Sequence, residues 1–193
     1  MDSPDPKRVF IVYGRNQKAY NAMRLFLQSL RLDPITFDEV RNQLGGSPFV
    51  GHIVRAGMER AQAIIILLTP DEYAELRPSL RSNHDKNDDI ARWQPRPNVL
   101  LEAGMALAID ETRTILVVLR SDVTLASDLH GRHFIHLSNN MDSRARMRDA
   151  LVGVHCSIDQ SLTQWHDVNL AGDFDALSAT VLPEVSPSSP FRR

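Results

Sequence analysis

Cysteine is nearly absent from this chain, with Cys156 as the one thiol among 193 residues. A single cysteine excludes an internal disulfide framework and any metal site built from cysteines. Long apolar runs are also missing, since none approaches the roughly 18 residues that a membrane helix needs. The amino terminus, Met-Asp-Ser-Pro-Asp-Pro, lacks the charged and then apolar layout of a signal peptide. We therefore expect a cytoplasmic protein that does not enter a membrane, with Cys156 as a small buried hydrophobe.

Several sequence fingerprints of catalytic sites are absent as well. Neither Gly-x-Gly-x-x-Gly nor Gly-x-x-x-x-Gly-Lys-Ser/Thr occurs, which argues against dehydrogenases and P-loop kinases, and no Gly-x-Ser-x-Gly elbow supports a serine hydrolase. His130, His133 and His136 recur at intervals of three, but a strand from His133 onward puts His133 and His136 on opposite faces. Without a cysteine or carboxylate at ligand spacing, no metal site and no bound cofactor are expected.

Excess charge of either sign is missing, because 22 Lys and Arg residues face 24 Asp and Glu residues, for a formal net charge of −2. That balance supports no general attraction to nucleic acid or to an anionic membrane. The 42% hydrophobic and 24% charged content is ordinary for a globular protein. The length suits one α/β domain with a full core.

Three continuous β-prone runs stand out, at residues 9–13, 63–69 and 114–119. Unbroken apolar runs of this length are typical of strands buried on both faces, as in a parallel sheet. Residues 34–37 and 133–137 are weaker candidates. Together they predict a parallel sheet of five strands.

Helical patterns lie between these runs. In residues 19–30, apolar side chains recur at intervals of three and four, and further helices are predicted over 48–60, 98–109 and 143–152. Strands that alternate with helices of this length require right-handed crossovers, which place helices on both sides of the sheet. The predicted fold is therefore a doubly wound, flavodoxin-like α/β domain.

Two segments depart from this alternation. Residues 71–97 form a long polar stretch rich in Asp, Asn, Arg and Pro, of the kind that is usually functional or disordered. After residue 176 the chain turns to Pro and Ser. We therefore expect one domain over residues 7–175 and a flexible tail or linker stump over residues 176–193.

In open α/β sheets, ligands bind beyond the carboxyl ends of the strands, where the strand order reverses. Gly14 would let the backbone turn sharply there, Arg15 can meet a phosphate, and the next helix offers free amide groups to an anion. Each piece alone has a plain alternative: Gly-Arg-Asn is a common turn, the Gly45-Gly46 pair can be just flexible, and Asp71 can cap a helix. The stretches that this rule selects are Gly14-Arg15-Asn16, Asp38-Glu39 with Gly45-Gly46-Ser47, Thr69 to Glu72, and Asn98 to Glu102.

Glu102 lies in the first turns of an otherwise apolar helix, with Asn98 as the nearest polar neighbour one turn earlier. An ionised carboxylate without water or a partner is costly to bury. Glu102 therefore lies either at the mouth of a cleft or as a solvated or capping charge near the helix amino terminus. In a dry cleft, one carboxylate can stabilise the positive charge that develops on a ribose C1′ when an N-glycosidic bond breaks.

With these motifs the chain resembles the bacterial TIR-like "predicted nucleotide-binding" family, relatives of Toll/interleukin-receptor domains. The likeness spans about residues 7–175, and the glutamate motif is its most specific element. Pro97 stands where the family usually has glutamine, and Gly46-Ser47-Pro48-Phe49 replaces its usual Gly-x-Thr-Ile. The segments that carry the resemblance are Val9 to Asn16, Phe26 to Ile35, Ala63 to Glu72, Arg96 to Gly104, Ser127 to Gly131, and Trp165 to Phe174.

The resemblance implies a flavodoxin-like domain that cleaves NAD+, as substrate and not as cofactor, at the nicotinamide–ribose bond. It also implies a role in antiphage immunity through NAD+ depletion, self-association through TIR–TIR contacts, and a sensor protein or sensor domain that drives it. Glu102 matches the catalytic glutamate of the family. The residues expected to bind substrate, from the resemblance and the sheet rule together, are Gly14, Arg15, Asn16, Glu39, Asp71 and Asn98.

Two other functions remain open at this point. One is a nonenzymatic TIR-like scaffold that binds a nucleotide or a partner domain and signals by assembly. The other is a nucleoside deoxyribosyltransferase-like enzyme, which would use a glutamate as nucleophile on a free nucleoside.

Overall fold

The computed structural model describes residues 4–81 and 91–176. The predicted tail, apart from residue 176, and the middle of the polar stretch, residues 82–90, lie outside the described residues.

The centre of the molecule is a five-stranded parallel sheet with the strand order β2-β1-β3-β6-β7. Its strands are β1 (Asp5–Val12), β2 (Asp33–Ile35), β3 (Ala61–Leu68), β6 (Thr114–Val118) and β7 (Ile135–His136). The register joins the three apolar runs directly, since Ile65 of β3 pairs with Ile11 of β1 and with Ile115 of β6. The order reverses after β1, which is the flavodoxin-like arrangement that the apolar runs predicted.

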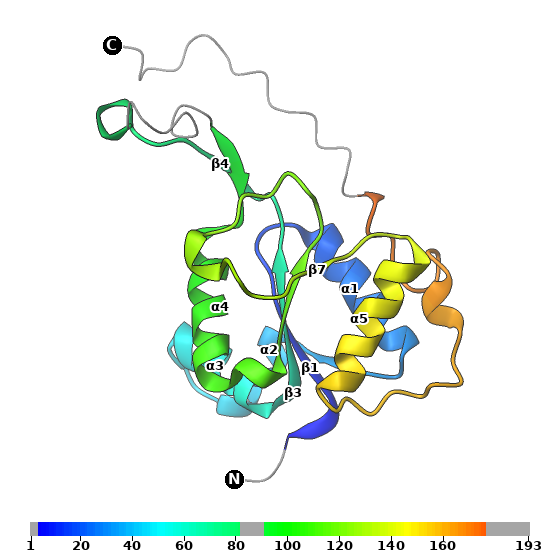
Figure 1. Ribbon diagram of the computed structural model, residues 1–193. Coiled ribbons are helices and arrows are strands. Elements are labelled where there is room, and N and C mark those ends of the chain that lie inside the picture. The colour runs from blue at the N-terminus through cyan, green and yellow to red at the C-terminus, as the bar shows by residue number, and fades with distance from the viewer. Residues whose placement is uncertain (1–3, 82–90, 177–193) are drawn as a thin grey trace.

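Helices cover both faces of this sheet (Figure 1). Helices α1 (Gln17–Ser29) and α5 (Met141–Gly153) pack on one face, and α3 (Val50–Arg60) and α4 (Pro97–Asp110) pack on the other. The domain has a hydrophobic core on each face of the sheet, and alternate residues of each strand point into one core or the other. Ile65 packs in the core under α1 and α5, and Ile64 packs in the core under α3 and α4. In the described residues no helix combines the length and the apolar character needed to cross a membrane.

One helix was not predicted. Helix α2 (Phe37–Leu44) begins directly after β2, where the sequence predicted that the strand continues to residue 37 and a loop follows. Its start is favourable because the Thr36 hydroxyl accepts a hydrogen bond from the Glu39 amide at 3.1 Å. Asp38 and Glu39 in its first turn also complement the helix dipole. Gly45 and Gly46 then end the helix with positive φ angles of 68° and 58°, a conformation that favours glycine.

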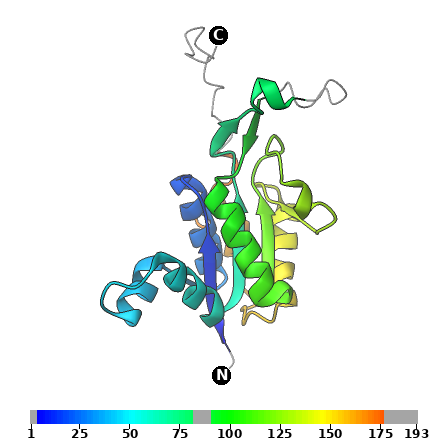
Figure 2. The same ribbon diagram turned by 90° about the vertical axis from the view of Figure 1, so that its left-hand side faces the viewer.

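The polar stretch contains a small antiparallel hairpin, β4 (Glu72–Ala74) with β5 (Arg92–Gln94). It extends beyond the carboxyl ends of the parallel strands (Figure 2). The Tyr73 and Trp93 rings pack together across it at 5.1 Å. Strands of three residues are too short for the alternation that identifies a strand in a sequence. Short 3₁₀ turns complete the fold at Pro78–Leu80, Glu111–Arg113, Ser127–Leu129 and Gln164–His166.

A buried arginine of α5, Arg144, binds the segment that follows this helix. The fully buried guanidinium of Arg144 donates to the carbonyls of Trp165, at 2.9 Å, and Ala171, at 3.2 Å. It also lies 5.0 Å from the centre of the Phe174 ring. These contacts attach the segment from Trp165 to Phe174 to α5.

Candidate active site

A cavity of about 860 Å³ opens at the carboxyl ends of β1 and β2, beside α4. This size lies within the range of small-molecule sites, and the position is the one that the switch-point rule predicts. Gly14, Arg15 and Glu102, three of the predicted site residues, line it. The full lining consists of Phe10, Ile11, Val12, Tyr13, Gly14, Arg15, Tyr20, Ile35, Thr36, Phe37, Asp38, Val54, Arg96 and Glu102.

Gly14 and Asp71 bring two loops into close contact at this edge. The Asp71 carboxylate accepts hydrogen bonds from the Thr69 hydroxyl at 3.0 Å and from the Arg15 backbone amide at 3.2 Å. A Cβ on Gly14 would fall 1.6 Å from Asp71 Oδ2, so no other residue fits there without moving the carboxylate. Glycine is therefore needed here for the close approach of the two loops, although its φ is not among the positive ones.

Asp71 is itself in an unusual environment. Burial raises the pKa of Asp71, although the Thr69 and Arg15 hydrogen bonds and the nearby Arg96 charge partly oppose that shift. Asp71 does not line the cavity. Its role in the described structure is to hold the Arg15 loop against the third strand.

Glu102 lies on α4 and faces the cavity with its side chain half buried. Burial raises the pKa of Glu102, and the charge of Arg96 partly opposes this. The carboxylate accepts no hydrogen bond from any residue within 4–81 or 91–176. The sequence left two possibilities open, namely that Glu102 lies at the mouth of a cleft or that it is a solvated or capping charge. The structure places it at a cleft.

Arg96 is a charged residue of the cavity lining that the sequence analysis did not single out. It directly precedes α4, and its Nε donates to Glu72 Oε1 at 3.3 Å. Its charge acts on both Asp71 and Glu102. Arg96 therefore lies between the carboxylates of the Asp71–Glu72 segment and the Glu102 carboxylate on α4. Its place at the start of the glutamate motif was the available signal, but the motif alone did not show which way the side chain points.

Aromatic rings form another part of the wall. Tyr13 follows β1, Tyr20 lies on α1, and their rings stack at 4.2 Å with an interplanar angle of 21°. Burial, together with the neighbouring Tyr13, raises the pKa of Tyr20. Seven positions separate the two residues along the chain, across a loop, so the sequence did not identify them as a pair.

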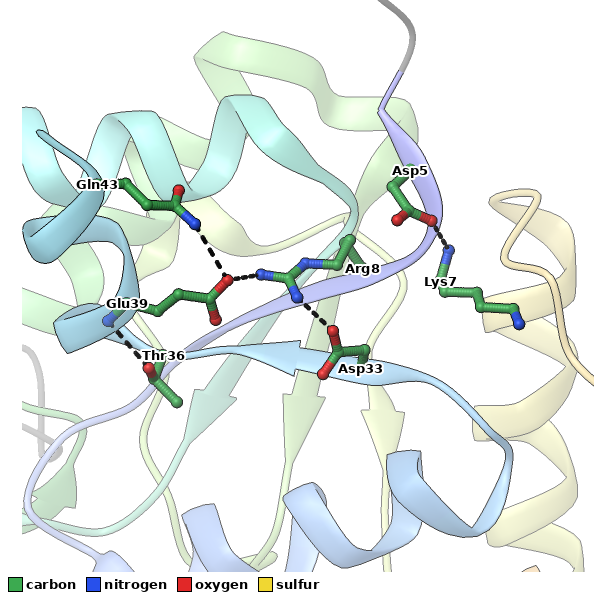
Figure 3. A network of polar contacts seen from close by, with 7 residues as sticks. All are labelled: Asp5, Lys7, Arg8, Asp33, Thr36, Glu39 and Gln43. Carbon is green, nitrogen blue, oxygen red and sulfur yellow. Dashed lines mark hydrogen bonds and ion pairs between the residues drawn. The ribbon is translucent and has the colours of Figure 1, made fainter.

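Three predicted binding residues are placed elsewhere. Asn16 caps α1 by accepting a hydrogen bond from the Ala19 amide at 3.0 Å. Asn98 is exposed and does not line the cavity. Glu39 does not line the cavity. Its side chain points toward Arg8 of β1, with which it pairs, and accepts a hydrogen bond from Gln43 at 3.4 Å (Figure 3). Arg8 also pairs with Asp33, so one guanidinium connects β1, β2 and α2.

A second cavity, of about 700 Å³, lies at the carboxyl ends of β6 and β7. Its polar lining includes Arg120, which is paired with Asp122, together with Asn140 and Arg146. None of the predicted site residues lines it. The Glu102 cavity is therefore the better candidate, because it combines a half-buried carboxylate, two arginines and an aromatic wall.

The arrangement suits a ligand that carries both signs of charge. Arg15 and Arg96 offer cations for phosphate groups, while Glu102 and Asp38 offer negative charge to a cationic ring or to a developing carbocation. Flat apolar rings can stack on tyrosine or phenylalanine side chains. A nucleotide with a positively charged base has this combination of features.

Comparisons with known proteins agree with this picture. The chain is 24% identical over 162 residues to the protein of Escherichia coli (strain K12) named "Uncharacterized protein YuaY", which covers 83% of this chain and 50% of that protein. It thus spans about half the length of the curated relative. The family model described as "CAP12/Pycsar effector protein, TIR domain" matches residues 8–139, about two thirds of the chain, and includes every residue that lines the Glu102 cavity. This chain belongs to the TIR-domain family of CAP12/Pycsar effector proteins.

Proposed function

We propose that this TIR domain cleaves NAD+ at the bond between nicotinamide and ribose, with Glu102 as the catalytic carboxylate. The observation that carries the proposal is the half-buried Glu102 side chain, which faces a cavity of nucleotide size and has no hydrogen-bonding partner among the described residues. An underpaired carboxylate in a partly dry site interacts strongly with a positive charge that appears beside it.

In the proposed step the C1′–N1 bond breaks, and its electron pair leaves with the nicotinamide nitrogen, which becomes neutral. Positive charge then spreads over C1′ and the ring oxygen of the ribose, beside the Glu102 carboxylate. Water attacks C1′ and loses a proton, which yields ADP-ribose. Attack by a group of the same molecule in place of water would give a cyclic product. The hydrolytic step needs no bound cofactor.

The other lining residues have matching tasks in this proposal. Arg15 and Arg96 are suited to the diphosphate, and the stacked Tyr13 and Tyr20 offer an aromatic surface to the base. Asp71 holds the Arg15 loop through its hydrogen bond to the backbone amide.

We further propose that the enzyme is an antiphage effector that arrests or kills an infected cell by depleting cytoplasmic NAD+. The family description, which names effector proteins, supports this role. Self-association is proposed to switch the activity on, in response to a sensor protein or a sensor domain. The aligned segment covers only 50% of the curated relative, which leaves room in that protein for such an additional domain.

The test is nicotinamide release from NAD+ by purified protein over a wide range of protein concentration, beside Glu102→Ala. We expect release that rises steeply with protein concentration and is lost in the variant. Equal turnover by both proteins would remove Glu102 from the mechanism. Calorimetry with NAD+ and ADP-ribose separates the enzyme from a scaffold, since tight binding without turnover in assembled protein favours the scaffold. Base exchange between deoxynucleosides would indicate a deoxyribosyltransferase.

A further inference from the structure

Two consecutive acids after β3, Asp71 and Glu72, contact both of the segments that bring an arginine to the Glu102 cavity. The Asp71 carboxylate accepts a hydrogen bond from the Arg15 backbone amide at 3.2 Å. Glu72 Oε1 accepts one from Arg96 Nε at 3.3 Å. Neither acid is among the described residues that line the cavity, so both act on its wall from outside. One short stretch of chain therefore holds the two cations of the site.

The β4–β5 hairpin brings Glu72 to Arg96, which lies 24 positions later in the chain. Glu72 begins β4 and pairs with Gln94 at the end of β5. The hairpin is attached to the loop after β6 as well, since the Thr124 amide donates to the Trp93 carbonyl at 2.7 Å. In Figure 2 the hairpin rises directly above the start of α4. Formation of the hairpin therefore decides which residue Glu72 meets.

The main chain of Arg96 is restrained too, because Pro97 follows it and opens α4. A residue before proline is confined to an extended backbone, and Arg96 has a φ of −56° and a ψ of 142°. The side chain passes close to Gly14, since Arg96 Cδ lies 3.6 Å from a Cβ built on that glycine. Pro97 thus adds a restraint on Arg96 that a glutamine at this position would not supply.

The contact with Glu72 occupies one edge of the Arg96 guanidinium and leaves the other donors available. The two Nη groups of Arg96 make no hydrogen bond with any residue of the described ranges 4–81 and 91–176. A guanidinium presents its donors as a planar fork, and two of them can bind a phosphate group together. An arginine that is already held at Nε loses less conformational freedom when such a ligand binds.

We propose that Glu72 is a positioning residue for a diphosphate subsite, in which it holds Arg96 at Nε so that the Nη groups meet the ligand. Asp71 gives the Arg15 loop the same support through the backbone amide. The subsite selects substrates that carry a diphosphate over a nicotinamide nucleoside, which has the same scissile bond but no phosphate. The kinetic part of this inference rests on the proposed function, whereas the binding part does not.

The charge of Glu72 has an effect of the opposite sign, because a carboxylate repels a diphosphate. The Glu72 side chain is 40% exposed, so water and salt screen this repulsion. The hydrogen bond to Arg96 Nε acts at contact distance and is screened less. Removal of the side chain should therefore weaken binding if Glu72 positions Arg96, and strengthen it if repulsion dominates.

The first experiment measures ADP-ribose binding by calorimetry. We expect Glu72→Ala to weaken binding about threefold, because the ligand must then order Arg96 itself. Glu72→Gln keeps an oxygen acceptor for Nε and should restore most of the affinity. Glu75→Ala is the matched control, since Glu75 lies in the same segment but pairs with Arg81, and it should bind as the wild type does. Tighter binding by both Glu72 variants, or no binding by the wild type, would overturn the proposal.

The second experiment repeats the Glu72→Ala measurement in an Arg96→Gln background. Arg96→Gln alone should weaken ADP-ribose binding about fivefold, through loss of a charge-assisted contact. Glu72→Ala should then have no further effect, because the residue that it positions is gone. A general distortion of the hairpin would act on the Arg15 loop as well and would persist in this background. An equal loss in both backgrounds would therefore refute the positioning role.

Nicotinamide release separates a failure of the subsite from a failure of the proposed enzyme. With NAD+, Glu72→Ala should raise KM about threefold and leave kcat within about twofold, since the contact supports binding and not the chemical step. With nicotinamide riboside, neither constant should change. If the Glu72 variants alter ADP-ribose binding as expected but the wild type releases no nicotinamide, the subsite stands and the proposed function fails. If nicotinamide is released with the same KM by the wild type and Glu72→Ala, the subsite fails and the proposed function stands.

Discussion

Two glutamates near the starts of helices, Glu39 on α2 and Glu102 on α4, have opposite environments. Glu39 lies toward the amino ends of β1 and β2, where Arg8 and Gln43 surround its carboxylate. Glu102 lies at the carboxyl end of the sheet, half buried, with a raised pKa and a single nearby charge, Arg96. A carboxylate whose partners are supplied by the protein stabilises the fold. One that is desolvated and left underpaired is available to a ligand, at some cost in stability.

The largest expected difference between the two glutamates is in catalysis. Glu102→Ala and Glu102→Gln should each lower kcat for nicotinamide release by about 10³-fold, because either change removes the charge opposite the developing carbocation. Glu39→Gln should leave kcat within about threefold, since Glu39 does not line the cavity. Steady-state nicotinamide release measures all three. A large loss in Glu39→Gln would show that the ion-pair network reaches the reaction.

The glycines at the two ends of the sheet should also differ. Gly14→Ala should lower kcat/KM by about 10- to 100-fold and the free energy of unfolding by about 1–3 kcal/mol, because the new Cβ collides with the Asp71 carboxylate. Gly153→Ala, at the end of α5 where a Cβ meets no atom within 4 Å, is the matched control and should be neutral. Urea unfolding and nicotinamide release measure the two effects. Full activity in Gly14→Ala would remove the Gly14–Asp71 contact from the site.

A pH profile should distinguish Arg96 from other paired arginines. The Arg96 charge holds the pKa of Glu102 below the value that burial alone would impose, so Arg96→Gln should raise the pKa of Glu102. The reaction needs the ionised carboxylate, and the acid limb of kcat/KM should therefore move to higher pH, with a roughly tenfold loss near pH 5 and a smaller one near pH 8. Arg132→Gln, which removes a remote pair with Glu111, should leave the limb in place. An unshifted limb in Arg96→Gln would contradict the coupling.

The smallest expected effect is on stability, and it tests the contrast most directly. The same change, glutamate to glutamine, should alter the free energy of unfolding in opposite directions at the two positions. Glu39→Gln should lower the free energy of unfolding by about 0.5–1 kcal/mol through loss of the Arg8 pair. Glu102→Gln should raise it, by less than about 1 kcal/mol, because burial raises the pKa of Glu102 and ionisation therefore opposes folding at neutral pH.

The gain in Glu102→Gln should be present at pH 7–8 and vanish below the ordinary pKa of glutamate, where both states are protonated. Urea unfolding across this pH range measures it. A gain that persists in acid would assign the effect to packing and not to charge.

The parts of the fold that follow from local pattern were predictable. The apolar runs around Ile11, Ile65 and Ile115 identified the three central strands, and the spacing in α1 identified its buried face. Helix α2 was missed because its start depends on one Thr36 hydrogen bond inside a polar stretch. The β4–β5 hairpin was missed because each strand has three residues, too few for a periodic signal.

The candidate site was only partly predictable. Glu102 could be singled out because a lone charge in an apolar helix needs an explanation. The stacking of Tyr13 on Tyr20 and the pairing of Arg96 with Glu72 could not be predicted, since both depend on the direction in which the side chains point. Asn16 follows the carboxyl end of β1, where ligands are expected to bind, but its side chain caps α1.

By itself the sequence determined the layered sheet and the presence of an unusual carboxylate, because burial of apolar runs and avoidance of unpaired charge are local requirements. Only the tertiary structure decided which acid is bound by the protein and which is left for a ligand. Arg8 reaches Glu39 from 31 positions away, and Asp71 reaches the Arg15 amide from 56 positions away. Electrostatic pairing depends on distance in space, and for residues so far apart in the chain that distance exists only after folding.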